Sequence, residues 1–230
     1  MNTMKLETTK IGNKDCRIYT AEQPMALLIQ PMGRHELKTI DREVELIAEG
    51  SGKMFVLAAF DIADWDMELT PWQDPAVSTI PEVGLRATNT LYYIDHTLLP
   101  WLCERFGDLP CILGGYSLSA LFSLWAATQT DDFAGIGASS PSVWIKDWLG
   151  YAEQHPTRAA DVYLSLGDKE ELTKDRSIAQ VGHNIRRYHQ MLLGQLGDTH
   201  TTLVWNEGTH FYNGTQRTAD GFTWCLNRLS

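Results

Sequence analysis

A serine at position 117 lies in a segment whose residue types suit covalent chemistry. The segment reads GGYSLSA, follows a short apolar run and leads into a stretch with helical periodicity. In a nucleophile elbow, a sharp turn between a strand and a helix exposes a serine hydroxyl, and the turn needs small residues two positions before and after the serine. Gly115 and Ser119 meet that condition. The segment therefore predicts Ser117 as a nucleophile, with the N–H of Leu118 at the helix N-terminus aimed at a developing oxyanion.

A simpler interpretation of Ser117 is that its side chain caps the helix that follows, which is a common role of serine. Capping does not require small residues on both sides of the serine, whereas the elbow does. The pattern around Ser117 therefore favours the nucleophile over the cap.

A histidine and an acidic turn follow where the partners of such a serine are expected. In triads of the α/β-hydrolase kind the chain order is serine, acid, histidine, with the acid after a later strand and the histidine before the last helix. Of the seven histidines, only His210 follows the end of a predicted strand, at residues 201–205. The acidic turn GDKEE follows the predicted strand at residues 162–166, and it offers three candidate acids: Asp168, Glu170 and Glu171.

The elements that must position these residues alternate between short apolar runs and longer stretches of helical period. This alternation is typical of an α/β fold with a mostly parallel central sheet flanked by helices on both faces. Strands are expected at residues 17–19, 26–30, 54–60, 111–113, 134–138, 162–166 and 201–205. Helices are expected at residues 37–48, 85–106, 118–128, near Trp148, and at 178–196 and 219–228. We expect the first fifty residues to form the antiparallel edge of the sheet.

The domain organisation is predicted to be simple. No repeat and no Pro/Gly/Ser-rich linker divides the chain, and 230 residues suit one α/β domain, so residues 1–230 are expected to form a single domain. Between the predicted strands at 134–138 and 162–166 there is room for only one short helix, so no large lid is expected.

Composition limits the class of partner. The chain carries 29 acids against 19 Lys and Arg, for a formal charge of -10, and no basic cluster relieves this charge. A nucleic acid or an anionic membrane is therefore not an expected partner. The uncharged stretch at residues 109–130 is too polar to span a bilayer. Four cysteines without a CxxC pair, and a polar start without an apolar signal-peptide stretch, predict a cytoplasmic protein.

These residues resemble the putative esterase family of the α/β hydrolases, which includes enterochelin esterases and S-formylglutathione hydrolases. The resemblance covers residues 53–228 and rests on the serine motif, the SPSVW segment at residues 140–144, the glycine-led acidic turn and the GTH motif that ends at His210. It implies an α/β-hydrolase fold, and it implies Glu170, three residues after Gly167, as the triad acid. Ser119 and Ala120 stand where many relatives have two glycines, and some relatives work with serine and histidine alone.

The remaining parts of the site are expected around these residues. A second oxyanion donor is expected after the predicted strand at residues 54–60, at the backbone N–H of Asp61. The irregular segment at residues 61–84 is rich in tryptophan and proline, which is typical of an ordered functional loop. Apolar walls of a substrate pocket are expected from four aromatic residues: Trp65, Trp72, Tyr116 and Trp144.

The sequence as a whole predicts a serine hydrolase that cleaves carboxylic esters or thioesters of small soluble substrates. The reaction would pass through an acyl-enzyme on Ser117, with His210 as general base. Two alternatives stay open: an acyltransferase that uses the same residues, and a non-catalytic binding protein with this fold. Whether the chain forms a homo-oligomer also stays open.

No metal and no other cofactor is expected. The acids at positions 61, 64, 66 and 68 lack the spacing and the glycine of an EF-hand loop. The motif that begins at Gly135 lacks the third glycine of a dinucleotide-binding fingerprint, because Ser140 stands in its place.

Overall fold

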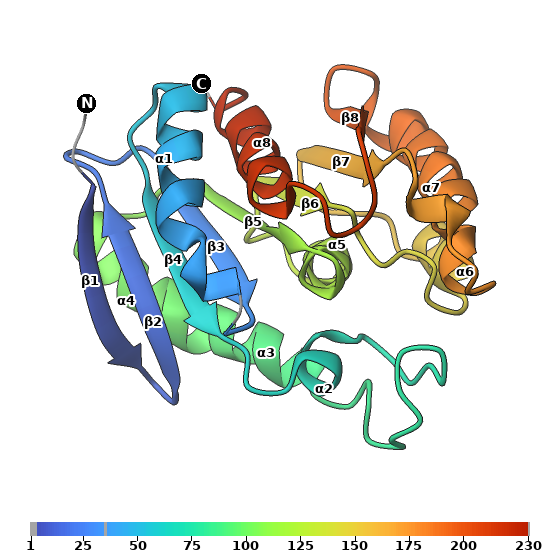
Figure 1. Ribbon diagram of the computed structural model, residues 1–230. Coiled ribbons are helices and arrows are strands. Elements are labelled where there is room, and N and C mark those ends of the chain that lie inside the picture. The colour runs from blue at the N-terminus through green and yellow to red at the C-terminus, as the bar shows by residue number, and fades with distance from the viewer. Residues whose placement is uncertain (1–3, 35, 230) are drawn as a thin grey trace.

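Eight strands form one sheet in the order β1-β2-β4-β3-β5-β6-β7-β8 (Figure 1). The computed structural model describes residues 4–34 and 36–229. The strands are β1 (Lys5–Ile11), β2 (Lys14–Thr20), β3 (Leu27–Met32), β4 (Val56–Asp61), β5 (Cys111–Tyr116), β6 (Gly135–Ser139), β7 (Asp161–Gly167) and β8 (Thr201–Asn206). The pairs from β4 through β8 are all parallel, so the mostly parallel sheet predicted from the sequence is confirmed.

The antiparallel edge is smaller than expected. It comprises β1 and β2, whereas β3, which also belongs to the first fifty residues, pairs in parallel with both β4 and β5. All six residues of β3 are buried, as is typical of a parallel strand covered on both faces. The expectation that this whole segment forms the edge was therefore wrong. β1, which the sequence pattern did not predict, supplies the outer strand.

Helices cover both faces of the sheet (Figure 1). On one face, α1 (Ile40–Ser51) and α8 (Gly214–Leu226) pack in one apolar cluster with the side chains of Leu28 and Leu57. On the other face the cluster includes residues of α3 (Ala87–Tyr93), the π-helical η2 (Ile94–Leu98), α4 (Leu99–Phe106), α5 (Leu118–Gln129), α6 (Trp148–Gln154) and α7 (Val181–Leu196). Alternate residues of β3 belong to opposite clusters, as the two-residue period of a strand requires.

The segment expected as one helix at residues 85–106 is not a continuous α-helix. It runs as α3, η2 and α4, and Pro100 lies in the first turn of α4. Proline has no N–H, so it cannot close the regular helical hydrogen bond to the residue four positions earlier. Short helical turns complete the structure: η1 (Glu36–Lys38), α2 (Trp65–Leu69), η3 (Glu170–Leu172) and η4 (Ile178–Gln180).

The apolar stretch after residue 109 is core rather than membrane span. Eleven of the twelve residues of α5 are buried, between the sheet and the surrounding helices. No helix among residues 4–34 and 36–229 combines the length and the apolar character that crossing a bilayer requires.

The carboxyl ends of β5, β6, β7 and β8 lie at one edge of the sheet, where parallel α/β sheets bind their ligands. Ser117 follows β5, Glu170 follows β7 and His210 follows β8. Between β6 and β7, residues 140–160 contain one helix, α6, of seven residues. The prediction that the segment between β6 and β7 holds one short helix and no large lid is therefore confirmed.

Close packing between β5 and α8 gives a first testable prediction. A Cβ added at Gly114 would lie 2.8 Å from the carbonyl oxygen of Gly137 and 2.8 Å from the ring of Phe222. Gly114→Ala should therefore lower the free energy of unfolding by about 1–3 kcal/mol through overpacking. Urea unfolding followed by circular dichroism measures this change.

The matched control is Gly194, in α7, where a Cβ would meet nothing within 4 Å. Gly194→Ala should raise the free energy of unfolding by about 0.4–1 kcal/mol, because alanine restricts the unfolded chain. Equal effects of the two variants would contradict the close approach of α8 to β5.

Candidate active site

Ser117 occupies a strained turn between β5 and α5. Its backbone angles are φ 60° and ψ -121°, a conformation that residues other than glycine rarely adopt. Its N–H donates to the carbonyl oxygen of Ser139, at 3.1 Å, which fixes the turn against β6. A Cβ at Gly115 would collide with the side chain of Ser119, so the small residues noted in the sequence are required at this turn. The strand, turn and helix have the geometry of a nucleophile elbow.

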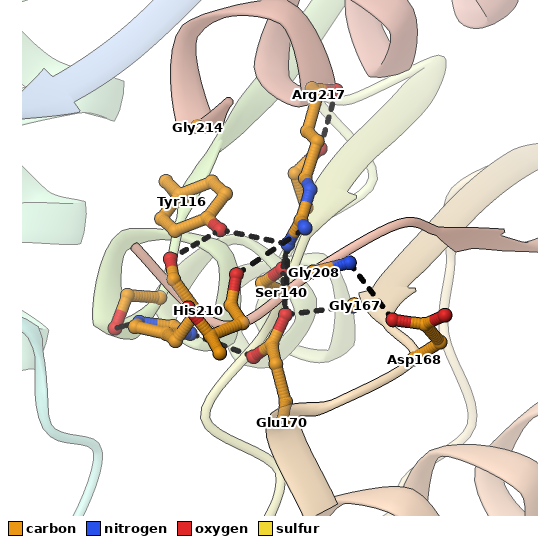
Figure 2. A network of polar contacts seen from close by, with 12 residues as sticks. Tyr116, Ser140, Gly167, Asp168, Glu170, Gly208, His210, Gly214 and Arg217 are labelled. Atoms are coloured by element: carbon orange, nitrogen blue, oxygen red, sulfur yellow. Dashed lines mark hydrogen bonds and ion pairs between the residues drawn. The ribbon is translucent and has the colours of Figure 1, made fainter. Parts of the chain in front are cut away.

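His210 links Ser117 to Glu170. The Nε2 atom of His210 lies 3.0 Å from the Oγ of Ser117, and its Nδ1 atom lies 2.7 Å from Oε2 of Glu170. Both distances are those of ordinary hydrogen bonds. The structure therefore brings together the three residues that the sequence singled out, which follow three different strands. Figure 2 shows His210 beside Glu170.

The second carboxylate oxygen of Glu170 accepts three further hydrogen bonds. Its Oε1 accepts hydrogen bonds from the N–H of Gly167 at 2.7 Å, the hydroxyl of Ser140 at 2.7 Å and the guanidinium of Arg217 at 2.9 Å. Burial raises the pKa of the Glu170 carboxyl, but hydrogen bonds and the charge of His210 outweigh burial and hold the pKa below its usual value. Glu170 is therefore an ionised carboxylate at neutral pH.

The other two acids of the turn have different partners. Asp168 accepts a hydrogen bond from the N–H of Gly208, at 2.8 Å, and so ties the acidic turn to the loop after β8. Glu171 forms a two-bond ion pair with Arg186 of α7, with both distances at 2.8 Å. Of the three acids in this turn, Glu170 is the one whose carboxylate contacts His210.

Arg217, in the first turns of α8, is a site residue that sequence reasoning missed. It is 1% exposed, and its guanidinium bonds Glu170, the hydroxyl of Ser140 at 3.1 Å and the hydroxyl of Tyr116 at 3.1 Å (Figure 2). A buried arginine is rare unless it is paired with an opposite charge. Arg217 meets this condition through its ion pair with Glu170. The residues around Arg217 do not predict these contacts. The last helix was expected to begin at residue 219, so Arg217 lay outside it.

Arg217 and Tyr116 also hold the histidine loop. The guanidinium donates to the carbonyl oxygens of Glu207 at 2.9 Å and Thr209 at 3.3 Å. The hydroxyl of Tyr116 donates to the carbonyl oxygen of His210 at 2.7 Å. Tyr116 was expected as a wall of the substrate pocket, but its ring lies beside the start of α8 and its hydroxyl belongs to this network (Figure 2). Burial raises the pKa of Tyr116, so it remains a neutral hydrogen-bond donor.

A cavity of about 740 Å³ opens at Ser117 and His210. It is lined by segments that follow β5, β6, β7 and β8. Trp144, which was expected as an apolar wall of a substrate pocket, is one of its lining residues. Trp65 is not one of the lining residues, and its indole lies beside Gly33, on the β3 side of Ser117. Trp72 stacks on Trp148, with ring centroids 6.3 Å apart, and donates to a backbone carbonyl oxygen. The indole rings of residues 65 and 72 therefore do not line this cavity, and that of residue 72 ties the long loop to the segment around Trp148.

Asp61 does not lie against Ser117, so its expected part in the oxyanion hole was wrong. Asp61 ends β4, and β3 separates β4 from β5. The N–H groups of Val56 and Ile62 donate toward β3, and N–H groups alternate sides along a strand, so the N–H of Asp61 points toward β2. Asp61 lines a separate polar cavity of about 500 Å³, together with Lys14 and Arg34.

The loop after β3, rather than the loop after β4, lies beside the start of α5. The hydroxyl of Ser119 donates to the carbonyl oxygen of Pro31, at 2.8 Å, and so holds the end of β3 beside the start of α5. The N–H of Leu27 donates toward β5, and the same alternation directs the N–H of Gly33 to the β5 side. An N–H in the loop after β3 is the second oxyanion donor in α/β hydrolases.

The side chain of Glu36 accepts a hydrogen bond from the N–H of Gly33. Its Oε2 accepts from the N–H of Gly33 at 2.9 Å, while its own N–H donates to the carbonyl oxygen of Gly33 at 3.0 Å. Burial raises the pKa of Glu36 to about 7, against the smaller lowering effects of the hydrogen bond from Gly33 and of the nearby charge of His210. Glu36 therefore carries a carboxyl group that titrates near neutral pH on the β3 side of Ser117.

Metal ligands do not gather in the part of the chain that the structure describes. Within it, no three His, Cys, Asp or Glu side chains form a group that could hold a metal ion. The Oγ, imidazole and carboxylate groups at Ser117, His210 and Glu170 can by themselves perform nucleophilic chemistry with proton transfer.

Comparison with known proteins identifies the family of the chain. The model of the family described as "Putative esterase" matches residues 40–216. No curated protein matches the sequence.

Solved structures share the fold at low sequence identity. The siderophore hydrolase EstA from Aspergillus nidulans has a TM-score of 0.72 at 15% identity, over 100% of this chain and 96% of its own. An IroE-like serine hydrolase from Shewanella oneidensis has a TM-score of 0.73 at 12% identity, over 95% and 79%. The enterobactin esterase FES from Shigella flexneri has a TM-score of 0.66 at 14% identity, over 96% and 58%. The family match and the shared fold lead to one conclusion: the chain belongs to the putative esterase family and is a carboxylic ester hydrolase with the α/β-hydrolase fold.

Proposed function

We propose that Ser117, His210 and Glu170 are a catalytic triad that hydrolyses esters of small molecules through an acyl-enzyme. The observation that carries this proposal is the unbroken chain of hydrogen bonds from Oγ to Nε2, at 3.0 Å, and from Nδ1 to Oε2, at 2.7 Å. An intact chain of this kind favours an enzyme over a non-catalytic binding protein. We also propose that residues 1–230 form one domain and that the protein is cytoplasmic. Its four free cysteine thiols are in line with this location.

Acylation uses His210 first as a base and then as an acid. Nε2 takes the proton from Oγ of Ser117 as this oxygen forms a bond to the carbonyl carbon of the ester. When the tetrahedral intermediate collapses, the bond to the alkoxy group breaks, and Nε2 gives the same proton to the departing alkoxy oxygen. Glu170 keeps Nδ1 protonated and stabilises the imidazolium that exists between these two transfers.

Deacylation repeats these steps with water. His210 takes a proton from water as its oxygen attacks the acyl carbon, and the bond between this carbon and Oγ of Ser117 breaks. The proton then returns to Oγ, so the products are one carboxylic acid and one alcohol, and the enzyme is restored. No observation favours an alcohol or thiol acceptor in place of water.

Two backbone N–H groups stabilise the oxyanion of both tetrahedral intermediates by donating hydrogen bonds to it. The N–H of Leu118 lies in the first turn of α5, where four N–H groups lack partners within the helix and the helix dipole favours negative charge. The N–H of Gly33 approaches from the β3 side. Because Glu36 holds this N–H in the structure, the substrate oxygen must displace the Glu36 carboxyl group.

Arg217 and Tyr116 act as positioning residues. They contact no reacting atom, but they join Glu170 to the backbone of the loop that carries His210. The carboxylate and the imidazole are therefore held in one rigid frame before a substrate binds, and such preorganisation lowers the barrier of the chemical step.

The nucleophile is tested by covalent labelling. A fluorophosphonate probe should label the folded protein once, at Ser117, because the elbow exposes this hydroxyl and His210 activates it. Mass spectrometry should find no label in Ser117→Ala. Ser142→Ala is the matched control, because this hydroxyl lies 3.4 Å from that of Ser117 and should not be needed for labelling. A label that persists in Ser117→Ala would identify another nucleophile.

The acid is tested by comparing three conservative variants. Glu170→Gln should lower kcat at least about 10²-fold, because a neutral amide cannot stabilise the imidazolium. Asp168→Asn and Glu171→Gln should lower kcat far less, since their carboxylates contact Gly208 and Arg186 rather than His210. Circular dichroism checks that all three variants fold. Three mild effects would mean that serine and histidine act as a dyad.

The assignment of Gly33 predicts an alkaline limb in the pH profile. The pKa of Glu36 is about 7, so this carboxyl group becomes negative as the pH rises through neutrality and then opposes an oxyanion at the same N–H. The kcat/KM of the wild type should therefore fall above pH 7. Glu36→Gln removes the charge, and its kcat/KM at pH 9 should exceed that of the wild type about tenfold.

The charged groups that face Glu36 are His210, from the loop after β8, and Glu43, from α1. Glu43→Gln is the control, because it removes a neighbouring buried carboxyl that does not bond Gly33. This variant should keep the alkaline limb. If Glu36→Gln changes stability but leaves the pH profile unchanged, Glu36 only closes the turn of η1 and Gly33 is not an oxyanion donor.

A further inference from the structure

Exposed apolar side chains gather at the mouth of the cavity beside Ser117. Phe211 is 94% exposed, Leu172 is 73% exposed and Ile178 is 36% exposed, and all three line this cavity. Single exposed apolar residues are common, but a group of them around one concave surface marks a binding site. The three residues come from two different segments, after β7 and after β8, that converge on the same opening.

The interior of the cavity continues this apolar character. Val181, which is buried, and the ring of Trp144 form part of its walls. Glu170 and Lys169 are the lining residues with charged side chains. The Glu170 carboxylate is already saturated by hydrogen bonds, and Lys169 lies exposed to solvent at the rim. A ligand group that fills this cavity therefore gains mainly from burial of apolar surface.

The cavity lies on one side of Ser117. Its walls follow β5, β6, β7 and β8, whereas Gly33 follows β3, on the other side of β5. In the proposed mechanism the carbonyl oxygen of the ester points toward Leu118 and Gly33. His210 gives its proton to the departing alkoxy oxygen, so the alkoxy group must lie on the His210 side of Ser117. The cavity is on that side.

We propose that this cavity is the alcohol subsite and that the enzyme takes esters of bulky apolar alcohols, with an aromatic or branched alkoxy group. This inference rests on the proposed mechanism, which fixes the direction of the leaving group. The volume of about 740 Å³ supports it, because cavities of about 300–1,000 Å³ hold ligands of drug size, well beyond an ethoxy group.

Two series of esters test the proposal. In the first series the acid is acetate and the alcohol grows from ethanol to butanol to benzyl alcohol. In the second series the alcohol is ethanol and the acid grows from acetate to butyrate to phenylacetate. With the wild type, kcat/KM should rise at least tenfold from ethyl acetate to benzyl acetate, and benzyl alcohol should inhibit competitively. Ser117→Ala provides the background rate of each ester.

A variant at the rim connects the preference to the cavity. Leu172→Ser removes apolar surface at an exposed position, so it should fold normally, and it should lower the ratio of kcat/KM for benzyl acetate to that for ethyl acetate at least threefold. Leu6→Ser is the matched control, because Leu6 is also an exposed leucine, 46% exposed, but lies on β1, at the opposite edge of the sheet. The control should leave the ratio unchanged.

The outcomes separate this inference from the proposed function. If neither series is hydrolysed above the Ser117→Ala background, the proposed function fails. If esters are hydrolysed but Leu172→Ser alters selectivity in the acid series instead, the cavity binds the acyl group and the inference is overturned. If Leu172→Ser leaves selectivity unchanged and converts an oligomer to a monomer in size-exclusion chromatography, the apolar rim is an interface between copies, which also overturns it.

Discussion

The buried carboxylate of Glu170 is the constraint on which the rest of the site depends. A charge removed from water is stable only when hydrogen bonds and an opposite charge replace the lost solvent. Glu170 satisfies this requirement with donors from four separate parts of the chain: Gly167, Ser140, His210 and Arg217. The same contacts that make the carboxylate stable therefore fix the ends of β6, β7 and β8 and the start of α8 relative to one another.

The parts of the site that the sequence predicted are those encoded locally. Ser117 is surrounded by the small residues that its turn requires, and His210 follows a strand and precedes the last helix, so a few neighbouring residues identify both. Glu170 was singled out only through the resemblance to a family, because the turn offers Asp168 and Glu171 within two residues. The distinction arises in three dimensions, where one of these side chains turns toward His210.

The parts that sequence reasoning missed depend on distant segments. The bond between Arg217 and the Tyr116 hydroxyl joins residues 101 positions apart, and no spacing pattern reports such a contact. The error at Asp61 has a similar cause, since strand order is set by pairing between whole strands. Pro31 is compatible with the central position of β3, although a proline usually argues against a central strand. In the structure β3 pairs with β5 only at residues 27–29, so Pro31 lies beyond that ladder.

The strained backbone at Ser117 links catalysis to the integrity of the interior. A residue at φ 60° and ψ -121° stays there only because α5 and β5 leave it no alternative, and α5 is almost entirely buried. Heating that loosens the packing around α5 would let this one peptide relax to an ordinary conformation, and the hydroxyl would then swing away from His210. The position of the nucleophile therefore depends on the same buried contacts that hold α5 on the sheet, so a cavity made in this part of the core would lower activity as well as stability.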